Sequence, residues 1–430
     1  MLFENIKKQD KLLYDLLLGE IKRQQDGVEL IASENYVSNA VLEAMRTVFT
    51  NKYSEGYPGK RYYGGQDFTD QIERIAIERA CNLFNCDHAN VQPLSGAIAN
   101  ISVLTAYLEP GDTVLGFELS HGGHLTHGSP VTFMSKVYNF VRYTVKDFET
   151  GQFDFDQIRD LAIKHRPKMI LVGYSAYPRD IDYAKFAEIG KEIGAMLWAD
   201  IAHIAGLISA GIMRNPFDFG FHVVSSTTHK TLRGPRGGLI LSKGKVSNPL
   251  KKVKKSIKNL PTLVDRAVFP GIQGGPIMNL IYAKAVAFGE ALQESFKEYA
   301  KQIVNNAKVF EKVFRDNGII MYTGGTDNHM IIFDSVKSFG YSGKTIQEAL
   351  DEAGITVSKS TIPFDTRSPV NPSGIRIGTP AITTRGYKEK EVEFLAECII
   401  KICKNPKDDK LKNRIKHEIA ELNKRFPIPY

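Results

Sequence analysis

The chain has 430 residues, of which 43% are hydrophobic, 10% aromatic and 24% charged. This balance is that of an ordinary globular protein, and it excludes disordered and fibrous architectures. The net charge of +8 would suit a cleft that binds an anionic small molecule.

The N-terminal segment is charged and has no apolar core of the signal-peptide type, so nothing in it predicts export. No stretch approaches the ~20 apolar residues that cross a bilayer. The four cysteines, Cys81, Cys86, Cys398 and Cys403, have neither CxxC spacing nor a zinc pattern. We therefore expect a cytoplasmic protein with reduced thiols and no membrane partner.

The first fifty residues carry helical patterns but no sheet of their own, and we expect residues 1–50 to form an arm that packs on a partner subunit. From Asp67 to Leu241, short apolar runs alternate with amphipathic ones, which is the pattern of βα units around a mainly parallel sheet. The expected strands are Ala89–Gln92, Thr113–Phe117, Met169–Val172, Met196–Ala199, Val223–Ser226 and Gly238–Leu241. The expected helices include Ile72–Phe84, Ala97–Leu108, Phe155–His165 and Tyr183–Ile193.

A long helical region from Pro276 to Asp316 leads into a second pattern. Here the expected strands are Ile319–Tyr322, Met330–Phe333 and Ile375–Ile377, and the expected helices are Thr345–Ala353 and Glu389–Lys404. We therefore predict an α/β fold, with a three-layer α/β/α large domain over residues 51–290 and a smaller C-terminal α+β domain over residues 291–430.

A basic run between these regions contains seven lysines from Lys243 to Lys258. Such a run could hold RNA phosphates, but it contains no aromatic residue on which bases could stack. We interpret it as a solvated face, and nucleic acid is not an expected partner.

The first candidate for chemistry is Leu94-Ser95-Gly96-Ala97, which joins a predicted strand to a predicted helix. Backbone amides and the Ser95 hydroxyl would face an anion at the helix N-terminus, which predicts a phosphate site without the GxxxxGK pattern. Simple helix capping is the alternative interpretation.

The histidines of His121-Gly122-Gly123-His124-Leu125-Thr126-His127 invite a metal interpretation. However, the loop contains a flexible Gly-Gly pair and no adjacent Cys or acid to complete a zinc site. We therefore expect no metal, and we prefer one imidazole stacked on a planar cofactor. A purely structural loop is the remaining alternative.

Two further candidates end neighbouring predicted strands. Asp200 follows Met196–Ala199, and Lys230 follows Val223–Ser226 within Thr227-Thr228-His229-Lys230. The carboxyl ends of strands in open α/β sheets are where ligands bind. A lysine there can form a Schiff base with an aldehyde cofactor, Thr227 can bind its phosphate, and an acid can pair with a pyridinium nitrogen. The alternatives are a surface lysine and a helix-capping aspartate.

Seven blocks in collinear order over nearly the whole chain resemble one known family. They are Leu30 to Tyr36 (LIASENY), Tyr53 to Gly65 (YSEGYPGKRYYGG), His121 to Pro130 (HGGHLTHGSP), Asp200 to Gly206 (DIAHIAG), Thr227 to Gly238 (TTHKTLRGPRGG), Phe269 to Pro276 (FPGIQGGP) and Ser373 to Ala381 (SGIRIGTPA). Together they resemble serine hydroxymethyltransferase, a fold-type I pyridoxal-phosphate enzyme. The family converts serine and tetrahydrofolate to glycine and 5,10-methylenetetrahydrofolate.

The resemblance implies a cofactor site in which Lys230 is covalently linked to pyridoxal phosphate, Asp200 pairs with the ring nitrogen and His124 stacks on the ring. His203 and Ser175 would lie near the 3' oxygen. The remaining implied cofactor contacts are Ser95, Gly96, Ala97, Thr227 and His229, together with Gly275 of the neighbouring subunit. A homodimer with shared active sites is thus expected, with a tetramer left open.

For the amino-acid substrate, the resemblance implies that Arg376 binds the carboxylate, with Ser33 beside it. An arginine suits this role because its fork reaches both carboxylate oxygens, although a surface ion pair is the alternative. Glu55 would handle protons on the serine hydroxyl and on folate. Tyr53 and Tyr63 would close the site from the second subunit.

The folate contacts implied by the resemblance are Leu119, Gly123, Leu125 and Ser360. At Ser360 the chain departs from the family, which usually has asparagine-lysine-asparagine where this chain has Ser358-Lys359-Ser360. A hydroxyl offers fewer donors and a shorter reach than an amide. A folate-independent aldolase that cleaves threonine or another β-hydroxy amino acid is therefore the alternative enzyme. A basic RNA-binding or scaffold protein with a relic fold is the alternative from another class.

Overall fold

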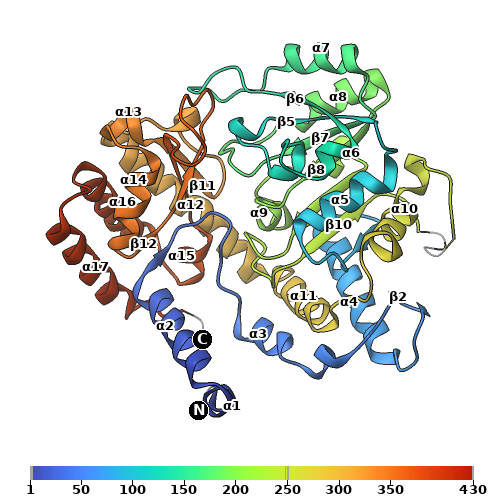
Figure 1. Cartoon of the computed structure of the whole chain (residues 1–430), viewed down its shortest axis with the longest axis horizontal. Helices are drawn as coiled ribbons and strands as arrows, with labels where there is room; N and C mark the ends of the chain where they lie inside the picture. Colours follow the sequence, from blue (N-terminus) through green and yellow to red (C-terminus); the bar gives the residue numbers. More distant parts are fainter. Residues whose placement is uncertain (1–2, 247, 249–250, 429–430) are drawn as a thin grey trace.

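The computed structural model describes residues 3–246, 248 and 251–428. Its main feature is a seven-stranded sheet (Figure 1). From edge to edge, its strands are β4 (His88–Asn90), β10 (Gly238–Ser242), β9 (Val223–Thr227), β8 (Met196–Asp200), β7 (Met169–Gly173), β5 (Thr113–Phe117) and β6 (Asn139–Tyr143). Strand β10 is antiparallel to β4 and β9, whereas the other five strands are parallel. The predicted mainly parallel sheet is confirmed.

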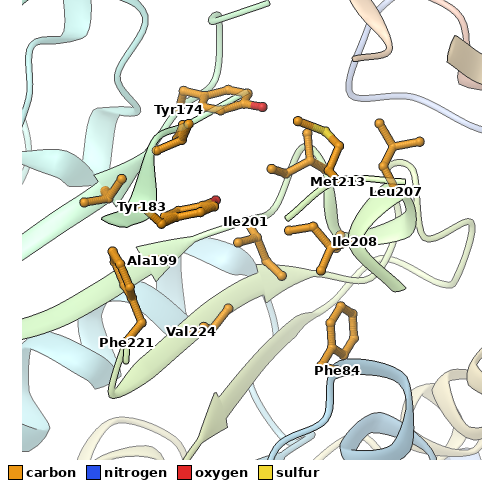
Figure 2. Close-up of a cluster of buried hydrophobic side chains, with 14 of the residues drawn as sticks. Phe84, Tyr174, Tyr183, Ala199, Ile201, Leu207, Ile208, Met213, Phe221 and Val224 are labelled. Atoms are coloured by element: carbon orange, nitrogen blue, oxygen red, sulfur yellow. The ribbon is translucent and has the colours of Figure 1, made fainter. Parts of the chain in front are cut away.

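The sheet is covered on both faces because successive side chains of a strand point in opposite directions. In β7, Met169 and Leu171 enter one hydrophobic core, and Ile170 and Val172 enter another. The first core is closed by α5 (Gly96–Tyr107) and α10 (Leu260–Arg266). The second is closed by α4 (Asp67–Phe84), α7 (Phe155–His165), α8 (Tyr183–Ile193), α9 (Ala205–Ser209) and α11 (Met278–Ala291), and Figure 2 shows part of it. The predicted three-layer arrangement is therefore confirmed.

A smaller α+β region follows in sequence, coloured orange and red in Figure 1. Its antiparallel sheet has the order β11 (Met330–Asp334), β14 (Gly374–Gly378) and β13 (Ser358–Ser360). Its helices are α13 (Ser335–Phe339), α14 (Gly343–Glu352), α15 (Pro380–Thr384), α16 (Glu389–Lys404) and α17 (Asp409–Asn423). The long helix α12 (Glu294–Asp316) joins the regions, since Phe296 packs in the large core and Phe310 and Phe314 pack in the small one.

The N-terminal segment contains α1 (Glu4–Gln9), α2 (Lys11–Asp26) and α3 (Asn39–Met45). Between α2 and α3, β1 (Val28–Glu29) pairs in parallel with β12 (Ile355–Thr356) of the small region. Helix α2 lies against α17, and α3 lies against α11. The arm is thus anchored on its own chain, and its packing on a partner, like the exact domain limits, stays a prediction.

Some predicted elements differ from the structure. Residues 319–322 form no strand, because Met321 makes only one bridge, to Phe333, before the chain turns at Thr323 with a φ of 62°. The helical region that was expected from Pro276 to Asp316 is interrupted at residues 292–293. Within the described chain, no helix is both long and apolar enough to cross a membrane.

Candidate active site

A cavity of about 390 Å³ lies at the carboxyl ends of β7, β8 and β9. Its volume is within the usual range for small-molecule sites. It is lined by Ser33, Ser95, Gly96, Ala97, Asn100, His124, Tyr174, Ser175, Asp200, Ala202, His203, Thr227, His229, Lys230, Arg236 and Arg376. The structure therefore brings together every predicted cofactor residue except Gly275, along with Ser33 and Arg376.

Asp200 is the last residue of β8 and is almost completely buried. Its Oδ2 accepts hydrogen bonds from Asn100 Nδ2 at 2.8 Å and from His127 Nε2 at 2.9 Å, and its Oδ1 accepts one from the Ala202 N–H at 3.0 Å. Burial opposes ionisation, but the hydrogen bond and charge of His127 outweigh it and lower the pKa of Asp200 below its ordinary value. The cavity thus contains a stable carboxylate.

Lys230 follows β9, the strand that pairs with β8, and its side chain is largely buried. Its carbonyl accepts a hydrogen bond from Asn35 Nδ2 at 2.9 Å, which holds the backbone of the turn. Burial lowers the pKa of Lys230 to about 8, against the attraction of Asp200, and the Arg376 charge adds to the lowering. A buried amine with this pKa has a substantial neutral fraction, which is the nucleophilic form.

The N-terminus of α5 forms one wall of the cavity. Ser95 caps the helix, since its Oγ accepts a hydrogen bond from the Ile98 N–H at 3.3 Å. A Cβ added to Gly96 would lie 2.6 Å from Thr227 Cγ2, so the helix end approaches the β9 strand end as only glycine allows. The amide groups and the Thr227 hydroxyl at this junction form a suitable anion site.

Three imidazoles line the cavity in neutral form, those of His124, His203 and His229, and burial lowers the pKa of His229 to about 3. Burial lowers the pKa of His124 to about 4, and His124 Nδ1 is 2.7 Å from Thr126 Oγ1. Burial also places the pKa of His203 well below its ordinary value, and His203 Nδ1 is 3.2 Å from His329 Nε2. Neutral, flat rings suit stacking and hydrogen bonding to a cofactor better than cationic ones would beside Lys230.

The metal interpretation of the histidine loop has a structural basis that the sequence did not reveal. His124, His127 and Asp200 place one ligand atom each within 4.8 Å of one another. However, His127 and Asp200 already form a hydrogen bond with each other. This bond explains the cluster without a metal, and the absence of a metal stays a prediction.

Arg376 lies on β14 of the small region and reaches the cavity formed by the large one. Its Nη1 donates to the Ser175 carbonyl at 2.7 Å, and its Nε is 3.4 Å from Ser358 Oγ. Burial lowers the pKa of Arg376 to about 10, so the group remains a cation at neutral pH. Because these partners are neutral, the charge of Arg376 is available to an anion.

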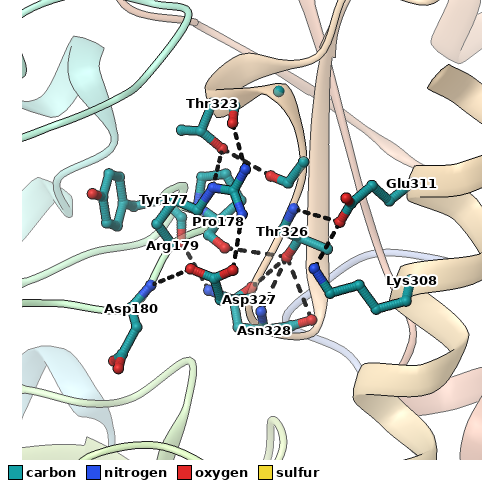
Figure 3. A network of polar contacts seen from close by, with 12 residues as sticks. Tyr177, Pro178, Arg179, Asp180, Lys308, Glu311, Thr323, Thr326, Asp327 and Asn328 are labelled. Carbon is teal, nitrogen blue, oxygen red and sulfur yellow. Dashed lines mark hydrogen bonds and ion pairs between the residues drawn. The ribbon is translucent and has the colours of Figure 1, made fainter.

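The segment after Ser175 is clamped to the small region (Figure 3). Asn328 Nδ2 donates to the Tyr177 carbonyl at 3.0 Å, and Arg179 Nη1 pairs with Asp327 Oδ1 at 2.8 Å. The Asp327 N–H donates to the Pro178 carbonyl at 2.8 Å. This clamp fixes the position of the carbonyl that holds Arg376.

The predicted residues Tyr53, Glu55, Tyr63 and Gly275 form a second group, called here the exposed cluster. The rings of Tyr53 and Tyr63 lie 5.5 Å apart, and Tyr53 Oη is 3.4 Å from Glu55 Oε1. A Cβ on Gly275 would lie 3.1 Å from the Tyr53 ring. In the part of the chain that the structure describes, no member of the exposed cluster lines the cavity.

The four predicted folate residues also lie outside the cavity lining of the described chain. Leu119 and Leu125 begin two short 3-10 turns, and Gly123 lies between these turns. Ser360 ends β13, and its Oγ donates to the Thr361 carbonyl at 2.9 Å. The segment of Leu119 to Leu125 and the segment that follows Ser360 lie close together: the ring centroids of His121 and Phe364 are 4.7 Å apart.

Asn100, His127, Tyr174 and Arg236 were not singled out in advance. Asn100 is a buried amide on the apolar helix α5, one turn after Gly96, and a buried polar group needs a partner. That signal was present in the sequence. The pairing of His127 with Asp200 was not predictable, because 73 residues separate them.

These donors match the groups of pyridoxal phosphate. A lysine amine, a carboxylate, a helix N-terminus and a neutral imidazole face the same cavity. The amine suits the cofactor aldehyde, and the carboxylate suits the ring nitrogen. The helix N-terminus suits the phosphate, and the imidazole suits the flat ring. Nδ1 of His229, buried in the cavity wall, has no hydrogen-bond partner among the described residues. The donor set therefore fits the cofactor.

Comparison with protein families agrees with this chemistry. A family model described as serine hydroxymethyltransferase matches residues 6–399 of the chain. The match includes the cavity residues, the exposed cluster and the predicted folate segments. The chain therefore belongs to the serine hydroxymethyltransferase family.

Proposed function

We propose that the protein interconverts serine and glycine and transfers the serine hydroxymethyl carbon to tetrahydrofolate, giving 5,10-methylenetetrahydrofolate. The observation that carries the proposal is the placement of Lys230 and Asp200 at the ends of paired strands, facing one cavity that also contains Arg376. Bound pyridoxal phosphate supplies an electron-withdrawing ring that labilises bonds at the substrate Cα. We place this activity in the cytoplasm.

The protonation states of Lys230 and Asp200 support the cofactor roles in this proposal. Lys230 would hold the cofactor through its aldehyde, because burial favours the neutral, nucleophilic form of the amine. Asp200 remains anionic and keeps a proton on the ring nitrogen. His124 stacks on the ring, and the N-terminus of α5 binds the phosphate with Thr227. His203 and Ser175, which line the same cavity, would bind the 3' oxygen.

Substrate binding combines two subunits in this proposal. Arg376 binds the carboxylate of the amino acid through its fork, and Ser33 lies beside it. Glu55 of the partner moves a proton at the serine hydroxyl, and Tyr53 and Tyr63 of the partner exclude water. The exposure of Tyr53 and Tyr63, at 60% and 52%, supports this assignment, because large exposed aromatics suit an interface.

Folate would bind between the segment of Leu119, Gly123 and Leu125 and the segment of Ser360. The contact between His121 and Phe364 supports a shared site for them. Ser360 is also the one feature that favours the alternative, a folate-independent aldolase on the same scaffold. Its hydroxyl is engaged by its own chain at the Thr361 carbonyl.

Serine turnover by the purified protein, with and without tetrahydrofolate, tests the proposal after a visible absorbance scan has shown bound cofactor. We expect serine cleavage to depend on tetrahydrofolate. Threonine cleavage together with serine turnover that ignores tetrahydrofolate would favour the aldolase. A colourless protein without turnover after incubation with pyridoxal phosphate would favour a relic fold.

A further inference from the structure

The four cysteines form two pairs with the same spacing, Cys81 with Cys86 and Cys398 with Cys403. Cys398 and Cys403 both lie inside α16 and are 1% and 0% exposed. Five residues of regular α-helix separate two Cα atoms by roughly 8 to 9 Å. Because a disulfide needs Cα atoms within about 7 Å, this pair cannot be cross-linked without unwinding the helix.

The first pair straddles the end of a helix instead. Helix α4 ends at Phe84, and Asn85 has the left-handed conformation, with φ 50° and ψ 52°. This residue reverses the chain, so that the Cys86 N–H donates to the Cys81 carbonyl at 3.1 Å. This hydrogen bond is the one that defines a Schellman motif at a helix C-terminus. In that motif the residue after the left-handed one, here Cys86, lies beside the residue whose carbonyl it binds, here Cys81. The covalent bond lengths and this 3.1 Å hydrogen bond together limit the distance between the Cα atoms of Cys81 and Cys86 to about 7 Å, which is within reach of a disulfide.

The surroundings of the first pair favour thiol chemistry. Both residues are half-buried at the edge of the large core, and Cys86 Sγ donates to the His88 carbonyl at 3.5 Å. Lys243 Nζ donates to the Asn85 carbonyl at 2.7 Å, which places a cation at the same turn. Its neighbour Cys86, and then the charges of His88 and Lys243, lower the pKa of Cys81 despite its burial and the charge of Asp87. By contrast, burial raises the pKa of Cys398 to about 11.

We propose that Cys81 and Cys86 form a reversible thiol–disulfide pair, with Cys81 as the nucleophile toward a hydroperoxide and Cys86 as the resolving thiol. The Cys81 thiolate attacks one peroxide oxygen, the O–O bond breaks and hydroxide leaves, so Cys81 becomes a sulfenic acid. The Cys86 sulfur then attacks the Cys81 sulfur, the S–O bond breaks, and the leaving oxygen takes the Cys86 proton as water. Two electrons pass from the sulfurs to the peroxide, and a thiol reductant restores both thiols.

The pair is separate from the proposed active site. Neither residue lines the cavity or belongs to the exposed cluster. The inference therefore does not depend on the proposed function, and each can fail without the other.

The test treats the full-length protein with dilute hydrogen peroxide, alkylates free thiols and maps peptides by mass spectrometry. Chymotryptic cleavage after Phe84 separates the two cysteines. We expect the two fragments to remain joined, with both alkylation sites lost, until dithiothreitol releases them. Cys398 and Cys403 serve as the matched pair and should stay unlinked and alkylate fully after unfolding.

Two variants test the order of the steps. In Cys86→Ser, dimedone should trap a sulfenic acid at Cys81, whereas in Cys81→Ser it should label Cys86 weakly or not at all. Complete alkylation of both wild-type cysteines after peroxide, or a sulfinic acid at Cys81 without any linked fragments, would overturn the proposal. Equal dimedone labelling in the two variants would overturn the assignment of Cys81 as nucleophile.

Discussion

The cavity and the exposed cluster differ in how completely one chain builds them. In the cavity, Asp200 has its hydrogen-bond donors from three segments of its own chain. In the exposed cluster, Glu55 Oε1 accepts a hydrogen bond from Tyr53 Oη at 3.4 Å and lies beside Gly274. One chain thus assembles the cavity, with Ser33 and Arg376 in its lining, whereas the proposal that the exposed cluster serves a second subunit stays a prediction.

The backbone beneath the exposed cluster is nevertheless firmly held. Arg61 is 3% exposed and donates to the carbonyls of Ser54 and Gly56, on either side of Glu55, at 2.9 Å each. It also pairs with Asp70 and Glu73. Because a buried charge network of this kind is costly to disrupt, Glu55 is presented on a fixed loop. The backbone of this loop is therefore fixed, and it is the side chains of Tyr53 and Tyr63 that are exposed.

Replacing Lys230 should have the largest effect, because it removes the reactive group of the cavity. Lys230→Ala should lose the visible absorbance of bound cofactor and at least about a thousandfold of the activity. In the wild type, borohydride reduction should label the peptide that contains residue 230. The matched control is Lys284, also buried, whose amine donates to three backbone carbonyls. Label on Lys284 would refute the assignment.

Mixing two inactive variants tests whether the exposed cluster serves the partner's cavity. Lys230→Ala and Glu55→Ala should each be inactive alone. After subunit exchange, hybrid dimers would have one intact site, and random mixing should restore about a quarter of wild-type activity. Mixing Lys230→Ala with a Lys230→Ala, Glu55→Ala double variant is the control and should restore nothing. No recovery despite demonstrated exchange would mean that each site is built by one chain.

The pH dependence of cofactor binding tests the pKa of Lys230 in the cavity and does not depend on the exposed cluster. Burial holds the pKa of Lys230 at about 8, below its ordinary 10.5, so the neutral amine declines about tenfold per pH unit below 8. The rate at which cofactor-free protein gains visible absorbance should fall accordingly. Between pH 8 and pH 10.5, Lys230 is protonated in the unfolded chain but neutral in the folded one. The contribution of Lys230 to the free energy of unfolding therefore rises with pH over this range. A loading rate that is flat below pH 8 would contradict this pKa.

The smallest effect is expected at Ser360, which ends β13 and lies outside both the cavity lining and the exposed cluster. Ser360→Asn should tighten tetrahydrofolate binding about two- to tenfold, since one hydrogen bond to a neutral group contributes ~0.5 to 1.5 kcal/mol. Calorimetric titration with glycine present measures the change. Threonine cleavage without folate should be unaltered, because Lys230 and Arg376 are unchanged. An equal or weaker affinity would show that another group already serves the pterin.

The sequence by itself determined six of the seven strands of the large sheet, all except β6, and the neighbouring strand ends of Asp200 and Lys230. Apolar alternation is a local property, and consecutive parallel strands place their carboxyl ends at one edge. Only the tertiary structure decided that His127 and Asn100 hold Asp200, that the Ser175 carbonyl holds Arg376, and that Met321 makes one bridge to Phe333 where a strand was predicted. These outcomes depend on which distant segments pack together. A buried charge or amide forms its hydrogen bonds with the groups that packing brings close to it. The periodicity of the sequence does not identify those groups.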